Sequence, residues 1–400
     1  LVRRAVALEE AALGSRHRLV GIHYGTLASL YDEAGELDQA MELQRRGLQV
    51  LQALPAPSPS HISAAYAALG RMEERRGDHR SALAYFEQEL AVLRRYLRAD
   101  HPYVADNYRQ QAEQYEALGR PAAALEKARA AVALLAPGAP PSGIPTAEQL
   151  ARVNLRDAMS LYRALFTLSR LLQRADAGLP ALGQALQGYE RGLQLQERLF
   201  QQLRTEDARL LSRAEARRFF EAAVGLCFEL YERSGSFRYA ERAWQFMEAS
   251  KAAVLRLALQ EQRALAFAGI PDSLLIRERQ LQADVHFASR RLHASEADDP
   301  AGEEERRRYE EQLFAAQRAY QQWKAQLERD YPDYFRLKYE QAPLGIAAAR
   351  ERLLDGETAL VAYFLGQEHL YALTIRQKDV HLWQAPADTA LTQNLHAFID

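Results

Sequence analysis

Candidate catalytic chemistry in this chain begins with its single cysteine, Cys227, and its ten histidines. A thiolate with a histidine beside it as base could attack a peptide carbonyl. Cys227, however, lies within the segment Gly225–Leu230, in the middle of an expected helix, and unpaired cysteine is among the most buried residue types. We therefore interpret it as a small core side chain. A single cysteine also excludes a disulfide framework and a cysteine-based zinc site, and no metal or other cofactor is expected.

Side chains suited to recognition are more prominent than side chains suited to catalysis. Arginine guanidinium groups make bidentate hydrogen bonds to carboxylates, so they could hold an acidic or backbone-exposing protein segment. An alternative stays open, in which these arginines are ordinary solvated groups or pair within the chain with Glu74 and Glu116. The candidate partner-binding residues lie on two expected helices and are Arg71, Arg75, Arg109, Gln110 and Glu113.

Charge composition argues against several partners. The chain has 51 basic and 53 acidic residues and a net charge of −2, so no global field favours nucleic acid or anionic lipid. The acidic run Glu303–Glu305 is interpreted as a solvated helix start, and the basic run Arg306–Arg308 as surface pairing at i,i+4. No apolar stretch is long enough to span a membrane, and the lone cysteine fits a reducing, cytoplasmic setting.

The elements that must position these side chains repeat along the chain. A glycine followed five residues later by an alanine recurs every 42 residues, and a tyrosine keeps the same step. A fixed period of this length predicts stacked helix-turn-helix units, with the glycine at the turn and the alanine where two helices approach closely. The recurring residues are Gly35, Gly77 and Gly119; Ala40, Ala82 and Ala124; and Tyr24, Tyr66 and Tyr108.

This pattern resembles the tetratricopeptide repeat, in the 42-residue variety seen in kinesin light chains, whose inter-repeat linker the segment Asp100–Ala105 also resembles. The resemblance implies an α-solenoid whose first helices line a concave face, and the candidate residues above are assigned to that face. Ala5 and Val6 stand 42 residues before Gly47 and Leu48, so the chain is expected to begin inside an earlier repeat.

Two weaker helix pairs are expected after the third repeat. The fourth has one helix near Glu148–Ala175, followed by a second helix that contains Ala185, Tyr189 and Leu193. The fifth is marked by Gly235, Ala240 and Trp244. The segment Pro137–Pro145, rich in proline and glycine, is expected to be an exposed loop between the third and fourth pairs.

The last third of the chain changes character. Residues 271–343 predict an antiparallel helical hairpin with a loop at Ala294–Gly302 and an end at Tyr331 and Pro332. Alternating apolar residues then predict a β-meander, and Asp388 with Thr389 is expected to cap a following helix. The expected strands are Ala359–Leu365, His369–Ile375 and Val380–Trp383.

Two segments resemble the bacterial TPR-CHAT proteins, in which repeats precede a caspase-like CHAT peptidase domain. Glu248–Ala252 is similar to the last repeat helix of that family, and Asp355–Phe364 to the first CHAT strand. The resemblance implies a Cys–His peptidase, with a histidine followed by glycine. No histidine here precedes a glycine, so no catalytic residue is assigned and the fragment itself is expected to be non-catalytic.

The expected fold is mainly α: a tetratricopeptide-repeat solenoid and a helical hairpin, then the first strands of an α/β caspase-like domain. The expected domains are residues 1–260, 271–343 and 344–400. The leading hypothesis is a protein-binding sensor that couples partner binding on the repeats to its own C-terminal peptidase domain. The alternative is a non-enzymatic adaptor with a degenerate caspase-like domain. Nucleic acid is expected only through a partner complex.

Overall fold

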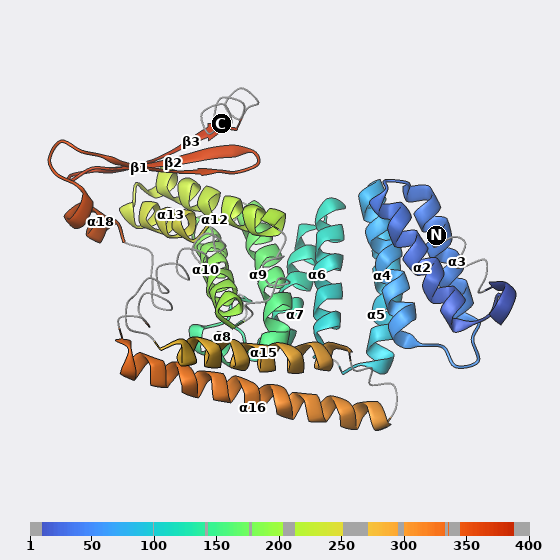
Figure 1. Cartoon of the computed structure of the whole chain (residues 1–400). Helices are drawn as coiled ribbons and strands as arrows, with labels where there is room; N and C mark the ends of the chain where they lie inside the picture. Colours follow the sequence, from blue (N-terminus) through green and yellow to red (C-terminus); the bar gives the residue numbers. More distant parts are fainter. Residues whose placement is uncertain are drawn as a thin grey trace. The chain divides into compact units, whose positions relative to one another are not determined.

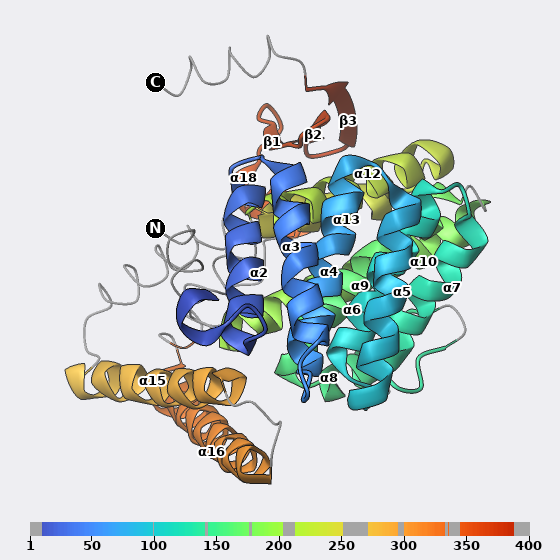
Figure 2. The ribbon, with the colours of Figure 1, turned by 90° about the vertical axis from the view of Figure 1, so that its right-hand side faces the viewer.

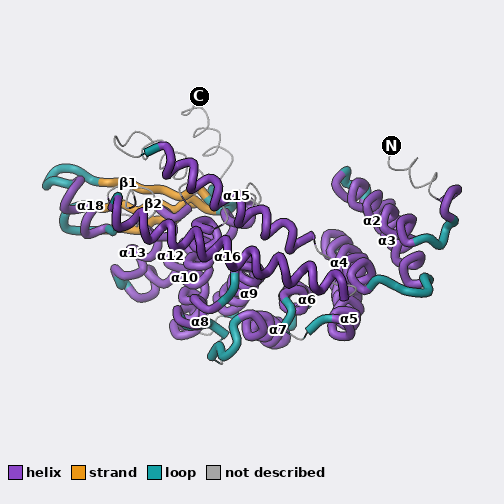
Figure 3. Tube along the Cα trace, turned by 60° about the horizontal axis from the view of Figure 1, so that its bottom comes forward, coloured by secondary structure: helices purple, strands orange, loops and turns teal. Residues whose placement is uncertain are grey.

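The computed structural model describes most of the chain and divides it into two compact units, Leu1–Gln196 and Glu197–Asp400. Helices make up most of the described part, and among the described residues strand occurs only in one small sheet (Figure 3). The described residues are 10–98, 100–140, 143–175, 178–202, 213–250, 271–294, 300–332, 335 and 345–387.

Three helix pairs of similar length form most of the first unit. The two helices of each pair pack against each other, and successive pairs lie side by side (Figures 1 and 2). The predicted helix-turn-helix repeats are therefore confirmed. Their bounds are α2 (Arg18–Glu33) with α3 (Leu37–Gln52), α4 (Pro59–Arg76) with α5 (His79–Tyr96), and α6 (Pro102–Ala117) with α7 (Pro121–Leu135).

The recurring glycine and alanine each have a visible physical role. Gly77 ends α4 in the left-handed region at φ 83°, where a β-carbon would be strained, and its backbone N–H caps the carbonyls of Glu73 and Glu74. The glycines one period before and after it have φ 81° and 69°. Ala82, which opens the next helix, is fully buried. A larger side chain at this position would push the two helices of the pair apart.

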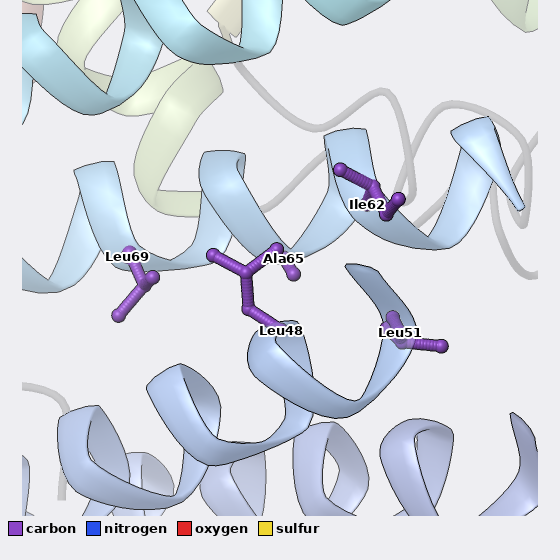
Figure 4. Close-up of a cluster of buried hydrophobic side chains, with 5 residues drawn as sticks. All are labelled: Leu48, Leu51, Ile62, Ala65 and Leu69. Carbon is purple, nitrogen blue, oxygen red and sulfur yellow. The ribbon is translucent and has the colours of Figure 1, made fainter. Parts of the chain in front are cut away.

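Apolar side chains also join one pair to the next. Leu48 and Leu51 on α3 pack against Ile62, Ala65 and Leu69 on α4 (Figure 4). All five residues are buried, so the core continues from the first repeat into the second without a polar break. This nearest-neighbour burial is what allows a repeat array to be stable.

The fourth helix pair departs from the sequence expectation at its start. The single helix expected near Glu148–Ala175 is two helices, α8 (Ala147–Arg152) and α9 (Leu155–Arg174). The break lies at Val153 and Asn154, which are both extended, and the Asn154 side chain caps the start of α9. Thr146 and Gln149 form a capping box that fixes the start of α8. The second helix of the pair is α10 (Gly178–Gln202).

The loop that precedes α8 is less exposed than expected. Pro137, Gly138 and Pro140 are exposed as the sequence predicted, but Gly143, Ile144 and Pro145 are buried. A β-carbon on Gly143 would lie 2.8 Å from the Leu168 side chain of α9, so the end of this loop packs as part of the core.

The second unit contains a fifth helix pair, α12 (Arg213–Ser234) and α13 (Phe237–Ser250). Gly235 at the turn has φ 63° and Ala240 is fully buried, which repeats the glycine–alanine arrangement of the first three pairs. The predicted helical hairpin is also present, as α15 (Asp272–Ala294) and α16 (Pro300–Asp330). Its core cluster consists of Leu281, Tyr320, Trp323 and Leu327.

Helix α16 ends at Asp330, just before Pro332, as predicted, but it begins at Pro300, inside the expected loop Ala294–Gly302. The predicted surface pairing of the basic run is confirmed, since Arg306 and Arg307 pair with Glu310 and Glu311 at i,i+4.

The predicted β-meander is confirmed as a three-stranded antiparallel sheet in the order β1-β2-β3. A short helix, α18 (Ile346–Leu353), precedes it. One face of the sheet is buried and contacts α12 and α13 (Figure 1). The helix expected from Asp388 onward lies outside the described residues. The strands are β1 (Leu360–Leu365), β2 (His369–Ile375) and β3 (Val380–Pro386).

Candidate functional site

The five candidate partner-binding residues lie on the first helices of the second and third repeats. Arg71 and Arg75 are on α4, and Arg109, Gln110 and Glu113 are on α6. Both α4 arginines are exposed, whereas Gln110 is only 8% exposed and lies beneath the surface. The candidate set is therefore open to solvent at α4 and largely covered at α6.

Helix α9 covers the α6 part of this surface. Ser160 donates a hydrogen bond of 2.8 Å to Asp106, and Thr167 donates one of 3.1 Å to Glu113. Arg109 lies between these two carboxylates on its own helix, 2.9 Å from Glu113 and 3.7 Å from Asp106. Arg109 and Glu113 therefore pair with each other, and this group joins α6 to α9.

Arg75 pairs with the preceding repeat, where its guanidinium forms an ion pair with Asp32 on α2. Arg71 makes no hydrogen bond or ion pair with the described residues within contact distance, although its charge acts on the buried carboxyl of Glu89. Of the three candidate arginines, Arg71 is thus the one whose guanidinium remains available to an external carboxylate or carbonyl.

An acidic residue at one repeat position links each repeat to the next. Asp32, Glu74 and Glu116 follow one another at the 42-residue step. Asp32 pairs with Arg75, and Glu74 accepts a hydrogen bond of 2.9 Å from Gln114. Glu116 pairs on α9 with Arg170 at 2.7 Å and Arg174 at 2.8 Å.

These contacts correct the intramolecular alternative considered for the sequence. Glu74 and Glu116 do make contacts within the chain, but their partners are Gln114, Arg170 and Arg174. The signal that could have found this acidic column was the 42-residue spacing of its three members.

The recurring tyrosines form a second column of links. Each of the three tyrosine hydroxyls forms a hydrogen bond with the side chain fourteen positions earlier in the chain. For Tyr66 and Tyr108, that side chain lies on the second helix of the preceding repeat, α3 or α5. Tyr24 donates to Glu10 at 2.6 Å, and Tyr66 accepts from Gln52 at 2.8 Å. Burial and the hydrogen bond to Glu10 raise the pKa of Tyr24 to about 12. Tyr24 is 4% exposed and belongs to the hydrophobic core of the first repeat.

A buried polar group joins the second and third repeats. Glu89 on α5 is 8% exposed and accepts a hydrogen bond of 2.9 Å from Asn107 on α6. Asn107 also donates to the backbone carbonyl of Phe86 and accepts from Gln111. Burial raises the pKa of Glu89 to about 7, and the hydrogen bond from Asn107 only partly offsets this effect.

Cys227 on α12 is fully buried, so the interpretation as a core side chain is confirmed. Within the described part of the chain, no group of three or more histidine, cysteine, aspartate or glutamate side chains is arranged to hold a metal ion. No helix among the same residues is long and apolar enough to cross a membrane.

Comparison with known proteins identifies the repeats. Residues 61–136, which span nearly all of α4 and the whole of α5, α6 and α7, match the tetratricopeptide repeat family model. No curated protein matches the chain. Because the family match ends well before the sheet, the link to CHAT peptidases stays a prediction.

The solved structures that are similar to this chain include the following two. BtubC (BKLC) from P. vanneervenii is 18% identical and covers 68% of this chain and 89% of its own, with a TM-score of 0.45. A putative kinesin light chain from Podosopora anserina with nearly identical TPR-like repeats is 22% identical and covers 59% and 99%, with a TM-score of 0.37.

Proposed function

We propose that the repeats of the first unit bind a protein segment along the first helices α2 and α4. The observation that carries this proposal is the change in exposure along one repeat position. Thr26 on α2 is exposed, Ala68 on α4 is half-buried and Gln110 on α6 is buried. The face is therefore open over the first two repeats and closed by α9 over the third.

The open face combines small polar side chains with the exposed guanidinium of Arg71. Thr26 and Ser29 are exposed on α2, and each donates a hydrogen bond to a carbonyl of its own helix. Leu30 beside them is 44% exposed, and Arg71 projects from α4. Such a surface suits an extended segment with an acidic residue near an apolar one, because Arg71 can bind the carboxylate and Leu30 can pack against the side chain.

A selection experiment tests this proposal. Random peptides are displayed on phage and selected on the full chain, and the affinity of enriched peptides is measured for the wild type, Arg71→Ala and Arg80→Ala. Arg80 is an exposed arginine on α5 and serves as the matched control. We expect acidic peptides whose affinity falls at least about fivefold in Arg71→Ala, as for a lost charge-assisted hydrogen bond. Equal affinity for both variants would contradict the proposal.

We further propose that this binding region regulates a caspase-like peptidase domain of a longer protein. Support comes from the TPR-CHAT resemblance of Glu248–Ala252 and Asp355–Phe364, and from the tetratricopeptide repeats that precede both segments. The whole protein is expressed with and without residues 1–260, and its peptidase activity and substrate choice are measured. Unchanged activation and substrate choice after removal of the repeats would refute the regulatory role.

The peptidase and the non-enzymatic adaptor can be distinguished by the reactivity of the longer protein. An adaptor would bind the same peptides through α2 and α4, but the longer protein would lack a reactive histidine and cysteine pair. Labelling of the whole protein with a thiol-reactive peptidyl probe separates the two, because labelling that depends on one histidine requires an activated cysteine.

A further inference from the structure

One stripe of α12 makes contact with the sheet along its whole length. The five residues of the stripe are spaced by four, four, three and three positions, which places them on a single face of the helix. The sheet lies against α12 and α13 in Figure 1. The stripe consists of Arg217, Glu221, Gly225, Phe228 and Tyr231.

The first turn of the stripe binds the backbone of the β1–β2 turn. The carboxylate of Glu221 accepts hydrogen bonds from three consecutive backbone N–H groups, those of Gln367 at 2.6 Å, Glu368 at 2.8 Å and His369 at 3.2 Å. One turn earlier on α12, Arg217 donates to the carbonyls of Leu365 at 3.1 Å and Gly366 at 2.7 Å. An anion thus satisfies the donors of the turn and a cation its acceptors.

The middle of the stripe fits one side chain of β2. Tyr371 is 3% exposed, and its ring lies 6.3 Å from that of Phe228. A β-carbon on Gly225 would stand only 2.7 Å from the Tyr371 hydroxyl. Glycine destabilises the interior of a helix relative to alanine, and the close approach of Tyr371 explains why this position has no β-carbon. At the far end, Tyr231 donates to the carbonyl of Val380 at 3.3 Å.

The three-stranded sheet depends on α12 and α13 to bury its apolar face. Its strands have only six or seven residues each, and a single sheet that is apolar on one face must bury that face against another element. Its buried side chains, including Phe364 and Leu373, lie on the face that meets α12 and α13. Arg217 and Glu221 contact only backbone groups of the β1–β2 turn. These contacts therefore do not depend on the exposed side chains of Gln367 and Glu368.

From these contacts we infer that the β1–β2 hairpin is a built-in ligand of the fifth helix pair. The α12 stripe binds this chain's own hairpin and is thereby closed to outside partners, which are left to the first unit. This last step rests on the proposed function of α2 and α4. The binding of the hairpin by α12 does not, because it requires no outside partner.

Hydrogen exchange in the full chain, without any added partner, tests the hairpin site. In Glu221→Ala, we expect the amides of Gln367, Glu368 and His369 to exchange at least about tenfold faster, since their acceptor is lost. Glu229→Ala is the matched control, because Glu229 lies on the same helix but pairs with Arg233 at 2.8 Å. Equal exchange of the turn amides in both variants would overturn the inference.

Gly225→Ala, alone and combined with Tyr371→Phe, tests the same contact even if Glu221→Ala unfolds the chain. Gly225→Ala favours the helix, so without the hairpin contact it would slow exchange in α12 and leave the turn unchanged. If the hairpin is bound to α12, the added methyl group displaces Tyr371, and the turn amides should exchange severalfold faster. Adding Tyr371→Phe removes the clashing hydroxyl and should restore slow exchange. No acceleration in Gly225→Ala would overturn the inference.

A selected peptide also tests whether the α12 stripe is closed to outside partners. Peptides selected on the full chain should slow amide exchange in α2 and α4 and leave α12 unchanged. Protection of α12 by such a peptide would refute the internal ligand, whereas a failure to select any peptide would refute only the proposed function.

Discussion

Glu116 near the end of α6 and Arg170 near the end of α9 approach each other to 2.7 Å, and both side chains are about four-fifths buried. Glu116 is the third member of the acidic column, and its contacts with α9 fix the helix that covers the third repeat. The column therefore explains why the candidate binding face is open at α2 and α4 and closed at α6. The acidic column therefore stabilises the stacking of the repeats and restricts the candidate binding face to α2 and α4.

Replacing Glu116 should destabilise the first unit. Glu116→Ala leaves Arg170 and Arg174 facing each other without their common carboxylate, and loss of one partner of a largely buried pair costs about 1–3 kcal/mol. Glu148→Ala is the control, because Glu148 and Arg152 form a pair with side chains more than 70% exposed. Urea denaturation followed by circular dichroism should show a loss for the first variant and almost none for the second. Equal losses would mean that the contact with α9 contributes little.

Glu89 should make the stability of the repeats depend on pH. Its pKa is about 7 in the folded chain against an ordinary 4.5, so the folded state holds the proton more tightly than the unfolded state. Its contribution is therefore most favourable below pH 4.5 and is lost as the pH rises to 7, by at most about 3 kcal/mol. The charged groups acting on Glu89 are Arg71 on α4 and Asp106 on α6.

The Glu89→Gln variant isolates this effect. We expect it to gain stability relative to the wild type between pH 5 and pH 7, because it has no charge to bury. Glu87→Gln, an exposed change on the same helix, should keep the wild-type profile. Free energies of unfolding at both pH values provide the measurement, and parallel profiles for wild type and Glu89→Gln would contradict the assignment.

Two helical glycines should respond in opposite directions to alanine. A β-carbon on Gly70 of α4 would meet the Phe86 ring at 2.5 Å, whereas Gly183 of α10 has nothing within 4 Å. Gly183→Ala should therefore stabilise the chain by up to about 1 kcal/mol, and Gly70→Ala should destabilise it by about 1–3 kcal/mol. Thermal unfolding of the two variants measures the difference, and a stabilising Gly70→Ala would show that the two helices of the second repeat are not so closely packed.

The repeat architecture was predictable because its determinants are local. Gly77 needs a positive φ and Ala82 a close helix contact, and both requirements recur at a fixed step that can be read from the sequence. The meander was predictable for the same reason, since alternation and turn residues mark each strand. The break between α8 and α9 was not predicted from the sequence, although Asn154 is a residue type that commonly caps the start of a helix.

The candidate site was only partly predictable because its state depends on long-range pairing. Sequence placed Arg75 and Arg109 on the right helices but could not show that Asp32 and Glu113 neutralise them. The burial of Gln110 depends on how α9 returns over α6, which has no local signal. The contact between Glu221 and the β1–β2 turn joins residues 146 to 148 apart and follows no repeat period.

The most direct test of the central claim is a hydrogen-exchange footprint of a selected acidic peptide on the full chain. We predict slower exchange in α2 and α4, with Arg71→Ala reducing the protection and Arg80→Ala preserving it. Protection confined to other helices, or an unchanged footprint in Arg71→Ala, would contradict partner binding on the open face of the first two repeats.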